Sequence, residues 1–215
     1  MDLVNSFEVD RPVEVAWVVL TDLERIAPCL PGAQLTEIEG DEYRGLMKVK
    51  VGPLVAKYQG TATFASRDEA ARVATIEASG RDPRQGNADA VITATLTPGA
   101  DGGTTVELVT NLSLSGKLAG FGTGMIEDVA ANLLGRFAAN LREMLVAEDG
   151  TTAPPYPAVA PRGGARRIRS PEAEPLDLAA AAGAPLLKRS LPVVAGFALG
   201  FLVVAVCVLR LRRRR

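Results

Sequence analysis

Few side chains in this sequence could carry out acid–base or nucleophilic chemistry. The chain has no histidine, the commonest general base near neutral pH, and only two cysteines, Cys29 and Cys207. Without a histidine to activate it, Cys29 is a poor nucleophile, and two distant cysteines cannot form a zinc cluster of the usual kind. Tyr43, Tyr58 and Glu14 remain, and they form no recognisable catalytic constellation. We therefore expect no enzymatic activity, no metal and no covalently attached cofactor.

What the spacing of residues does indicate is a domain of strands closed by a helix. Apolar and polar residues alternate in residues 3–9 and again in five later segments, a pattern typical of antiparallel strands with one wet face. Pro12 is expected to open a helix that ends before Pro28. The predicted α+β domain covers residues 1–148, with further strands near 34–38, 43–51, 56–64, 74–78, 88–96 and 106–114, and a last helix near 121–147.

The last helix carries an amphipathic stripe that should lie on the sheet, formed by Met125, Val129, Leu133, Phe137, Leu141 and Leu145. The sheet residues facing it are small, among them Ala62, Ala78 and Ala90. Because protein interiors are close-packed, either the helix approaches the sheet closely or space remains for an apolar ligand. In the second case the predicted lining residues are Tyr43, Met47, Tyr58, Phe64, Ile76, Ile92, Leu96, Leu118, Phe121, Met125 and Val129.

The charge distribution divides the chain in two. Residues 1–148 hold 13 basic and 21 acidic residues, whereas residues 149–215 hold 11 basic and 4 acidic ones. The first part is thus acidic, which disfavours nucleic-acid binding, because phosphate contacts need a clustered basic face. The basic second part is predicted to be a separate appendage.

Residues 190–209 contain no charge, and about 20 apolar residues suffice for a helix to cross a bilayer. The alternative, a buried core helix, rarely has cationic residues at both ends, as Arg189 and Arg210 do here. We predict a transmembrane anchor at 190–209 and a basic tail at 210–215. The five arginines after the span favour a cytoplasmic tail, which would require the domain to be exported across the membrane. The start of the chain shows no export signal, and we give this observation more weight. We therefore expect the domain on the cytoplasmic side of the cell inner membrane, with a single-pass C-terminal anchor.

Residues 149–189 are predicted to be a flexible linker. They contain seven prolines and a cluster of arginines between 162 and 169, a composition that cannot bury enough apolar area to fold. As a flexible coil such a segment spans roughly 35–40 Å. Its arginines could lie on anionic headgroups, or the segment could be an ordinary solvated linker.

The order of several short motifs resembles a known family. Arg11–Asp22 resembles the start of the START-like, or SRPBCC, superfamily of helix-grip domains. Together with Ile26–Ala33, Lys48–Pro53, Tyr58–Gly60 and Gly116–Gly122, it is similar to the CoxG family of carbon monoxide dehydrogenase subunits. This resemblance covers residues 1–147 and implies an antiparallel sheet wrapped round the C-terminal helix, with a hydrophobic cavity between them.

The resemblance also implies partners. One is a carbon monoxide dehydrogenase or a related molybdenum hydroxylase, which the protein would recruit to the membrane. The other is membrane lipid. The ligand implied is a quinone, menaquinone or ubiquinone, that accepts electrons in the enzyme's electron transfer. Tyr43 and Tyr58 are the best candidates to contact its polar ring, although both could instead be half-exposed strand tyrosines. Two alternatives stay open: a ligand-free assembly or docking subunit, and a general lipid-binding START-like protein.

Overall fold

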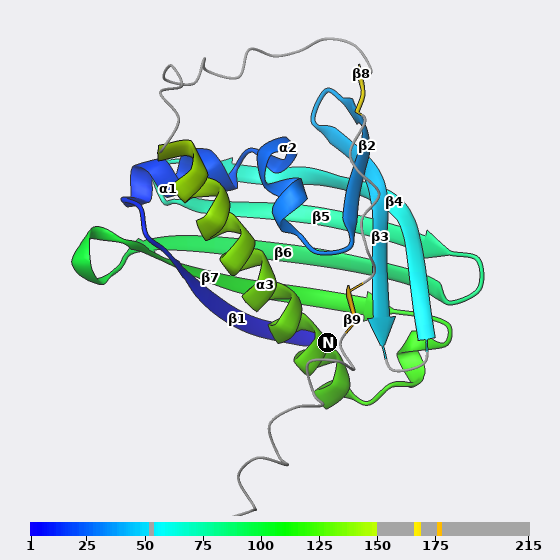
Figure 1. Cartoon of the computed structure of the whole chain (residues 1–215). Coiled ribbons are helices and arrows are strands. Elements are labelled where there is room, and N and C mark those ends of the chain that lie inside the picture. Colours follow the sequence, from blue (N-terminus) through cyan, green and yellow to red (C-terminus); the bar gives the residue numbers. More distant parts are fainter. Residues whose placement is uncertain (52–53, 150–165, 169–175, 178–215) are drawn as a thin grey trace, which may run out of the picture. The chain divides into compact units, whose positions relative to one another are not determined.

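The computed structural model describes residues 1–51, 54–149, 166–168 and 176–177, and shows one curved antiparallel sheet crossed by a long helix (Figure 1). The main strands follow the order β1-β7-β6-β5-β4-β3-β2, and each neighbouring pair is antiparallel. This confirms the predicted strands and the α+β class. The strands are β1 (Asp2–Val9), β2 (Ala33–Glu39), β3 (Glu42–Val51), β4 (Leu54–Asp68), β5 (Val73–Asp82), β6 (Gly86–Pro98) and β7 (Thr104–Leu114).

The helical elements are α1 (Val13–Leu20), α2 (Leu23–Ile26), η1 (Ala27–Cys29), η2 (Ala100–Gly102), η3 (Leu118–Gly120) and α3 (Thr123–Asp149). The prediction of a single helix between Pro12 and Pro28 is therefore wrong, because the helical conformation is interrupted at Thr21 and Asp22. The Thr21 hydroxyl donates to the carbonyl of Trp17 at 2.7 Å. The Asp22 carboxylate then accepts the backbone N–H of Arg25 at 3.1 Å and caps α2.

A row of three glycines crosses the sheet where it bends. Gly45, Gly60 and Gly80 lie opposite one another on β3, β4 and β5. A Cβ atom on Gly60 would lie 1.8 Å from the carbonyl oxygen of Ser79, and one on Gly45 would lie 2.5 Å from that of Gln34. The strands can therefore fold this tightly only without side chains here. Beyond this row, β2 and β3 run across the direction of β6 and β7 (Figure 1).

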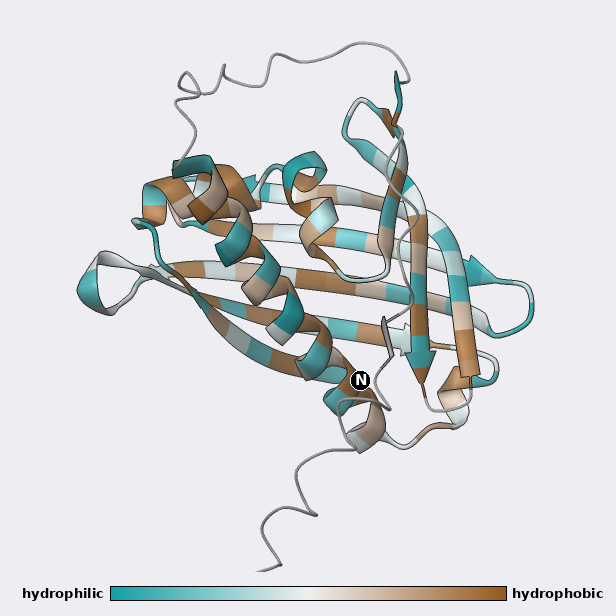
Figure 2. Ribbon diagram, viewed as in Figure 1, coloured by the Kyte–Doolittle hydropathy of each residue, from teal (hydrophilic) through white to brown (hydrophobic). Residues whose placement is uncertain are grey.

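The main hydrophobic core lies between α1, the C-terminal half of α3 and one end of the sheet. Trp17, Val106 and Leu141 are buried there, and Phe7 contacts Phe137 edge-on with ring centroids 5.7 Å apart. On α3 the buried residues are Ile126, Phe137, Leu141 and Leu145. Met125, predicted in this stripe, is 45% exposed, because the helix turns its neighbour Ile126 inward. Figure 2 shows hydrophilic residues along the outward side of α3.

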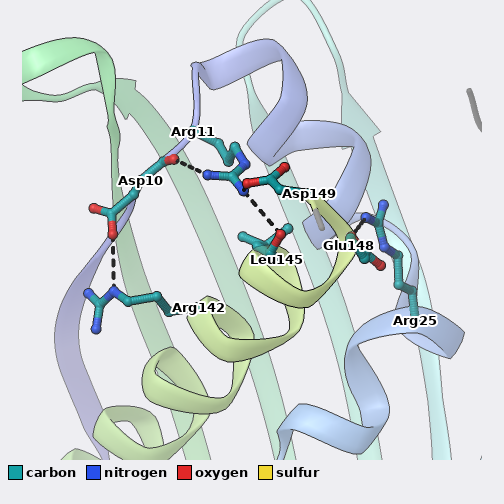
Figure 3. Close-up of polar contacts among 7 residues, drawn as sticks. All are labelled: Asp10, Arg11, Arg25, Arg142, Leu145, Glu148 and Asp149. Atoms are coloured by element: carbon teal, nitrogen blue, oxygen red, sulfur yellow. Dashed lines mark hydrogen bonds and ion pairs between the residues drawn. The ribbon is translucent and has the colours of Figure 1, made fainter. Parts of the chain in front are cut away.

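Ion pairs fasten the last turns of α3 to the segment around α1 and α2 (Figure 3). Arg11 pairs with Asp149 and also donates to the carbonyl of Leu145 at 3.1 Å. Arg25 pairs with Glu148, and Arg142 lies 3.0 Å from Asp10. These contacts complement the apolar core beneath them and fix this end of α3 over the sheet.

Two short segments of the predicted linker add to the sheet edge. β8 (Arg166–Arg167) pairs with β2 opposite Glu37 and Ile38, and β9 (Leu176–Asp177) runs parallel to β3 at Val49 and Lys50. The N–H of Ile168 donates to the carbonyl of Thr36 at 2.9 Å. An uncovered edge strand offers unpaired backbone groups, which explains why a proline-rich segment binds there.

The predicted anchor at 190–209 and tail at 210–215 lie outside the described residues, as does most of the linker. Within the described ranges, no helix is both long and apolar enough to span a membrane.

Replacing Gly60 with alanine should lower the free energy of unfolding by about 3 kcal/mol, because the new methyl group overlaps the Ser79 carbonyl. Chemical unfolding of the full chain in detergent, followed by fluorescence of the buried Trp17, measures the change.

Gly135→Ala is the matched control. A Cβ at Gly135 meets nothing within 4 Å, so this helical substitution should stabilise by up to about 1 kcal/mol. Equal stability of the two variants would contradict the role assigned to the glycine row.

Candidate ligand-binding site

The inner face of the sheet is lined by small residues and remains partly open to solvent. Register places Ala62 beside Ala78, Ala78 beside Ala90, and Ala74 beside Ala94. Of these, Ala62, Ala78, Ala90 and Ala94 are only half-buried, although they point toward the side of the sheet that α3 crosses. The helix lies closest to β1 and η1. Ala74 and Leu96 pack in the main core beside α3, whereas the four alanines farther along β4–β6 stay partly exposed.

An apolar cluster lies at the end of this face away from α1. Its buried members are Val51, Ala56, Tyr58 and Leu118, from β3, β4 and η3. Met47, Phe121 and Val129 pack against it from β3, the η3–α3 connection and α3. The sequence-predicted residues Met47, Tyr58, Leu118, Phe121 and Val129 thus come together in one place.

The other predicted lining residues are more dispersed. Tyr43, Ile76 and Ile92 are half-buried on the inner face. Leu96 is buried in the main core and Phe64 packs against it, so both lie toward α1 rather than in the apolar cluster. Met125 is exposed on the first turn of α3, one helical turn from Phe121 and Val129.

Three polar atoms around this face are buried without a hydrogen-bond partner in the part of the chain that the structure describes: the Tyr58 hydroxyl, Gln85 Oε1 and Asn132 Oδ1. Tyr58 and Gln85 are 7% and 8% exposed. Asn132 lies one turn beyond Val129, which packs against the Tyr58 cluster. Leaving a buried polar group unsatisfied costs about 1–3 kcal/mol, so a water molecule or a ligand that supplied a partner to any of these atoms would remove that cost.

The buried carboxylate of Asp82 organises the surroundings of Tyr58 and Gln85. It accepts the backbone N–H of Lys57 at 2.7 Å, and those of Arg84 and Gln85 at 2.7 and 3.2 Å. These donors hold the pKa of Asp82 below its ordinary value. Tyr58 follows Lys57 directly, so the backbone of both Tyr58 and Gln85 lies next to this carboxylate.

Burial raises the pKa of both predicted tyrosines. For Tyr58 the charge of Asp82 adds to the effect of burial, and for Tyr43 the charge of Asp22 does so. Both phenols consequently stay protonated near neutral pH and can donate a hydrogen bond. The sequence pointed to Tyr58 but missed Gln85 and Asn132, since an isolated amide carries no pattern. An aspartate closing a strand before Pro83 was the one signal of a structured turn here.

Cys29 lies in the main core, away from the apolar cluster around Tyr58. Burial raises the pKa of the Cys29 thiol, and its sulfur lies 3.7 Å from that of Met144 in the main core. Among the described residues, no group of three or more cysteine or acidic side chains is placed to hold a metal ion. Two surface depressions flank β1, one lined by Val9 and Leu145 and the other by Leu3 and Ala131, and neither includes a predicted lining residue.

Comparisons with solved structures support the fold. A conserved protein from Geobacillus kaustophilus is 21% identical, with a TM-score of 0.62 over 69% of this chain and 97% of that chain. An uncharacterized protein from Bacillus thuringiensis is 10% identical, with a TM-score of 0.51 over 68% of this chain and 99% of that chain. A search of the curated proteins finds no match.

The family model for CoxG, a carbon monoxide dehydrogenase subunit, matches residues 6–146, which span β1–β7 except the start of β1, and almost all of α3. This is the part of the chain that the sequence motifs cover. The architecture is the helix-grip arrangement expected of START-like, or SRPBCC, domains. The chain belongs to the CoxG family of carbon monoxide dehydrogenase subunits.

Proposed function

We propose that this protein is a membrane-anchored accessory that carries a quinone for a carbon monoxide dehydrogenase or a related molybdenum hydroxylase and recruits that enzyme to the membrane. The observation that carries the proposal is the buried Tyr58 hydroxyl, which has no partner among the described residues and lies in an apolar cluster beside a half-open inner face. The family match supports the choice of enzyme partner.

The apolar part of the site suits an isoprenoid chain. Met47, Phe121 and Val129 would contact it beside Tyr58, and the small residues of β4–β6 would leave room for it. Burial of apolar surface stabilises by roughly 25 cal/mol per Å², so even part of an isoprenoid chain would provide most of the binding free energy.

The unpartnered polar atoms suit the ring of such a ligand in both of its redox forms. The Tyr58 hydroxyl can donate to the carbonyl oxygen of a quinone. The amide oxygens of Gln85 and Asn132 can accept from the hydroxyl groups of the reduced quinol. A carrier that delivers one form and removes the other needs both capacities.

The substitution Tyr58→Phe tests whether the Tyr58 hydroxyl binds a ligand or is only part of the hydrophobic core. Removing an unsatisfied buried hydroxyl should raise the free energy of unfolding of the ligand-free protein by about 1 kcal/mol. The same change should weaken quinone binding about tenfold, because one hydrogen bond to the ring is lost. Calorimetric titration of the detergent-solubilised full chain with a short-chain menaquinone measures the affinity.

Tyr43→Phe serves as the control, because Tyr43 lies outside the apolar cluster, half-buried on β3. It should change both quantities less than Tyr58→Phe does, because the Tyr43 hydroxyl is not one of the buried polar atoms that lack a partner. If Tyr58→Phe stabilises the protein but neither the unmodified chain nor the variant binds quinone, the protein is better described as a ligand-free docking subunit.

Recruitment is tested by removing the predicted anchor. Deleting residues 186–215 should move the partner hydroxylase from the membrane fraction to the soluble fraction, because the tether no longer holds it near the bilayer. Fractionation of cells and an activity stain for the hydroxylase measure this. Restoring an unrelated single-pass helix should bring the enzyme back, whereas persistence at the membrane after the deletion would contradict recruitment by this chain.

A further inference from the structure

The basic residues of the folded domain are distributed unevenly. All four lysines in residues 1–149 lie at the end of the sheet where β3 meets β4 and where η3 begins, and two arginines from the end of β5 and the following turn join them. This end lies at the right and lower right of Figure 1. We refer to this group as the basic rim; its members are Lys48, Lys50, Lys57, Arg81, Arg84 and Lys117.

Backbone hydrogen bonds hold three members of the rim together. The Asp82 carboxylate binds the backbone N–H of Lys57 and of Arg84, and the carbonyl of Gln85 accepts the N–H of Lys117 at 3.0 Å. The last contact requires Gly116, which has a φ of 73°, since a Cβ there would lie 2.2 Å from the Gln85 oxygen. The start of β4, the β5–β6 turn and the β7–η3 connection are thus brought to one place, and each presents an exposed cation.

Four members of the rim have no counter-ion among the residues that the structure describes. Arg11, Arg25 and Arg142 form ion pairs near the C-terminal end of α3, and Arg44 contacts three glutamates on β2 and β3. Lys57, Arg81, Arg84 and Lys117, by contrast, form no ion pair with any residue that the structure describes. Lys57 also lies directly opposite Lys48, an arrangement that like-charge repulsion disfavours.

Exposed apolar side chains accompany these cations. Val55 is 49% exposed and lies opposite Lys50 on the outer face of the hairpin. Met125 is 45% exposed on the first turn of α3, which follows η3. Cations interleaved with exposed apolar residues are typical of surfaces that bind the interface of a bilayer containing anionic lipid.

The covalent chain is compatible with the same arrangement. β9 pairs with Val49 and Lys50, so Asp177 lies at the rim. Residues 178–189 separate it from the predicted span, and a segment of that length extends over at most about 40 Å.

We propose that the basic rim docks on anionic lipid headgroups and turns the Tyr58 end of the sheet toward the bilayer. The proposal rests on the proposed function, because a quinone carrier must exchange its ligand with the membrane. The Tyr58 cluster lies directly beneath the rim: Ala56 and Tyr58 flank Lys57, and Leu118 follows Lys117. Docking would therefore bring the ligand site next to the lipid that holds the ligand.

The test uses the full chain in lipid nanodiscs, with Cys207→Ser and a fluorophore on Val55→Cys. Spin-labelled lipid should quench this fluorophore when phosphatidylglycerol is present, and much less in phosphatidylcholine alone or at high salt. The triple variant Lys57→Gln/Arg84→Gln/Lys117→Gln should lower the docking equilibrium about 100-fold, since each cation near an anionic surface contributes about fivefold.

Two controls match the test. Arg67→Gln/Arg136→Gln/Arg142→Gln removes the same charge from other surfaces and should leave quenching at position 55 unchanged. A fluorophore on Val109→Cys reports an exposed site on β7, 41% exposed, and should not respond to phosphatidylglycerol.

Equal quenching in both lipid compositions, or quenching that survives the rim triple variant, would overturn the proposal. If the fluorescence at position 55 changes only when the hydroxylase is added, the rim binds a protein partner and the lipid-docking proposal is wrong. Quinone titration in detergent involves no lipid surface, so the triple variant should bind quinone normally there. Loss of binding in that assay would instead count against the carrier function.

Discussion

The bend of the sheet along Gly45, Gly60 and Gly80 is the constraint on which the other features depend. A Cβ atom at Gly60 would lie within bonding distance of a neighbouring carbonyl oxygen, so only glycine allows β3–β5 to approach in this way. Because the sheet turns there, β2 and β3 run across the direction of β6 and β7 (Figure 1). On the inner face of β4–β6, Ala62, Ala78 and Ala90 stay only half-buried.

The two ends of the domain use charge in different ways. At the C-terminal end of α3, arginines and carboxylates satisfy one another and close the structure over the main core (Figure 3). At the opposite end, the carboxylate of Asp82 accepts three backbone N–H groups, and the side chains of Lys57 and Arg84 form no ion pair with any described residue. The unpartnered hydroxyl of Tyr58 lies at this second end. The closed end therefore provides stability, and the open end is suited to binding.

Much of the fold could be predicted because alternation in a strand depends only on local sequence. Every main strand was found in this way, as was the long α3. The predictions that were wrong or missing concern features that depend on contacts between residues or segments rather than on a local pattern. Met125 and Ile126 are adjacent and both apolar, so only packing decides which of them turns inward. The break between α1 and α2 depends on a capping bond from Asp22, and β8 and β9 depend on a sheet edge that a local pattern does not reveal.

Of the candidate site, the apolar residues and Tyr58 could be predicted, but the two amide side chains could not. Met47, Leu118 and Val129 carry hydrophobic periodicity, whereas Gln85 and Asn132 become notable only when the fold leaves their oxygens buried without partners. The same holds for the basic rim, whose members are far apart in the sequence and come together through the contacts of Asp82 and Gln85.

The central claim, that the inner face holds an apolar ligand, is tested most directly by organic extraction and mass spectrometry of the full chain purified from its own membranes. The extract should contain a quinone at close to one equivalent. That signal should be lost when Ala90 on the inner face is replaced by phenylalanine, but should be kept when the adjacent, outward-facing Val91 is replaced in the same way. An extract without quinone from the unmodified chain, or one unchanged by Ala90→Phe, would contradict the account.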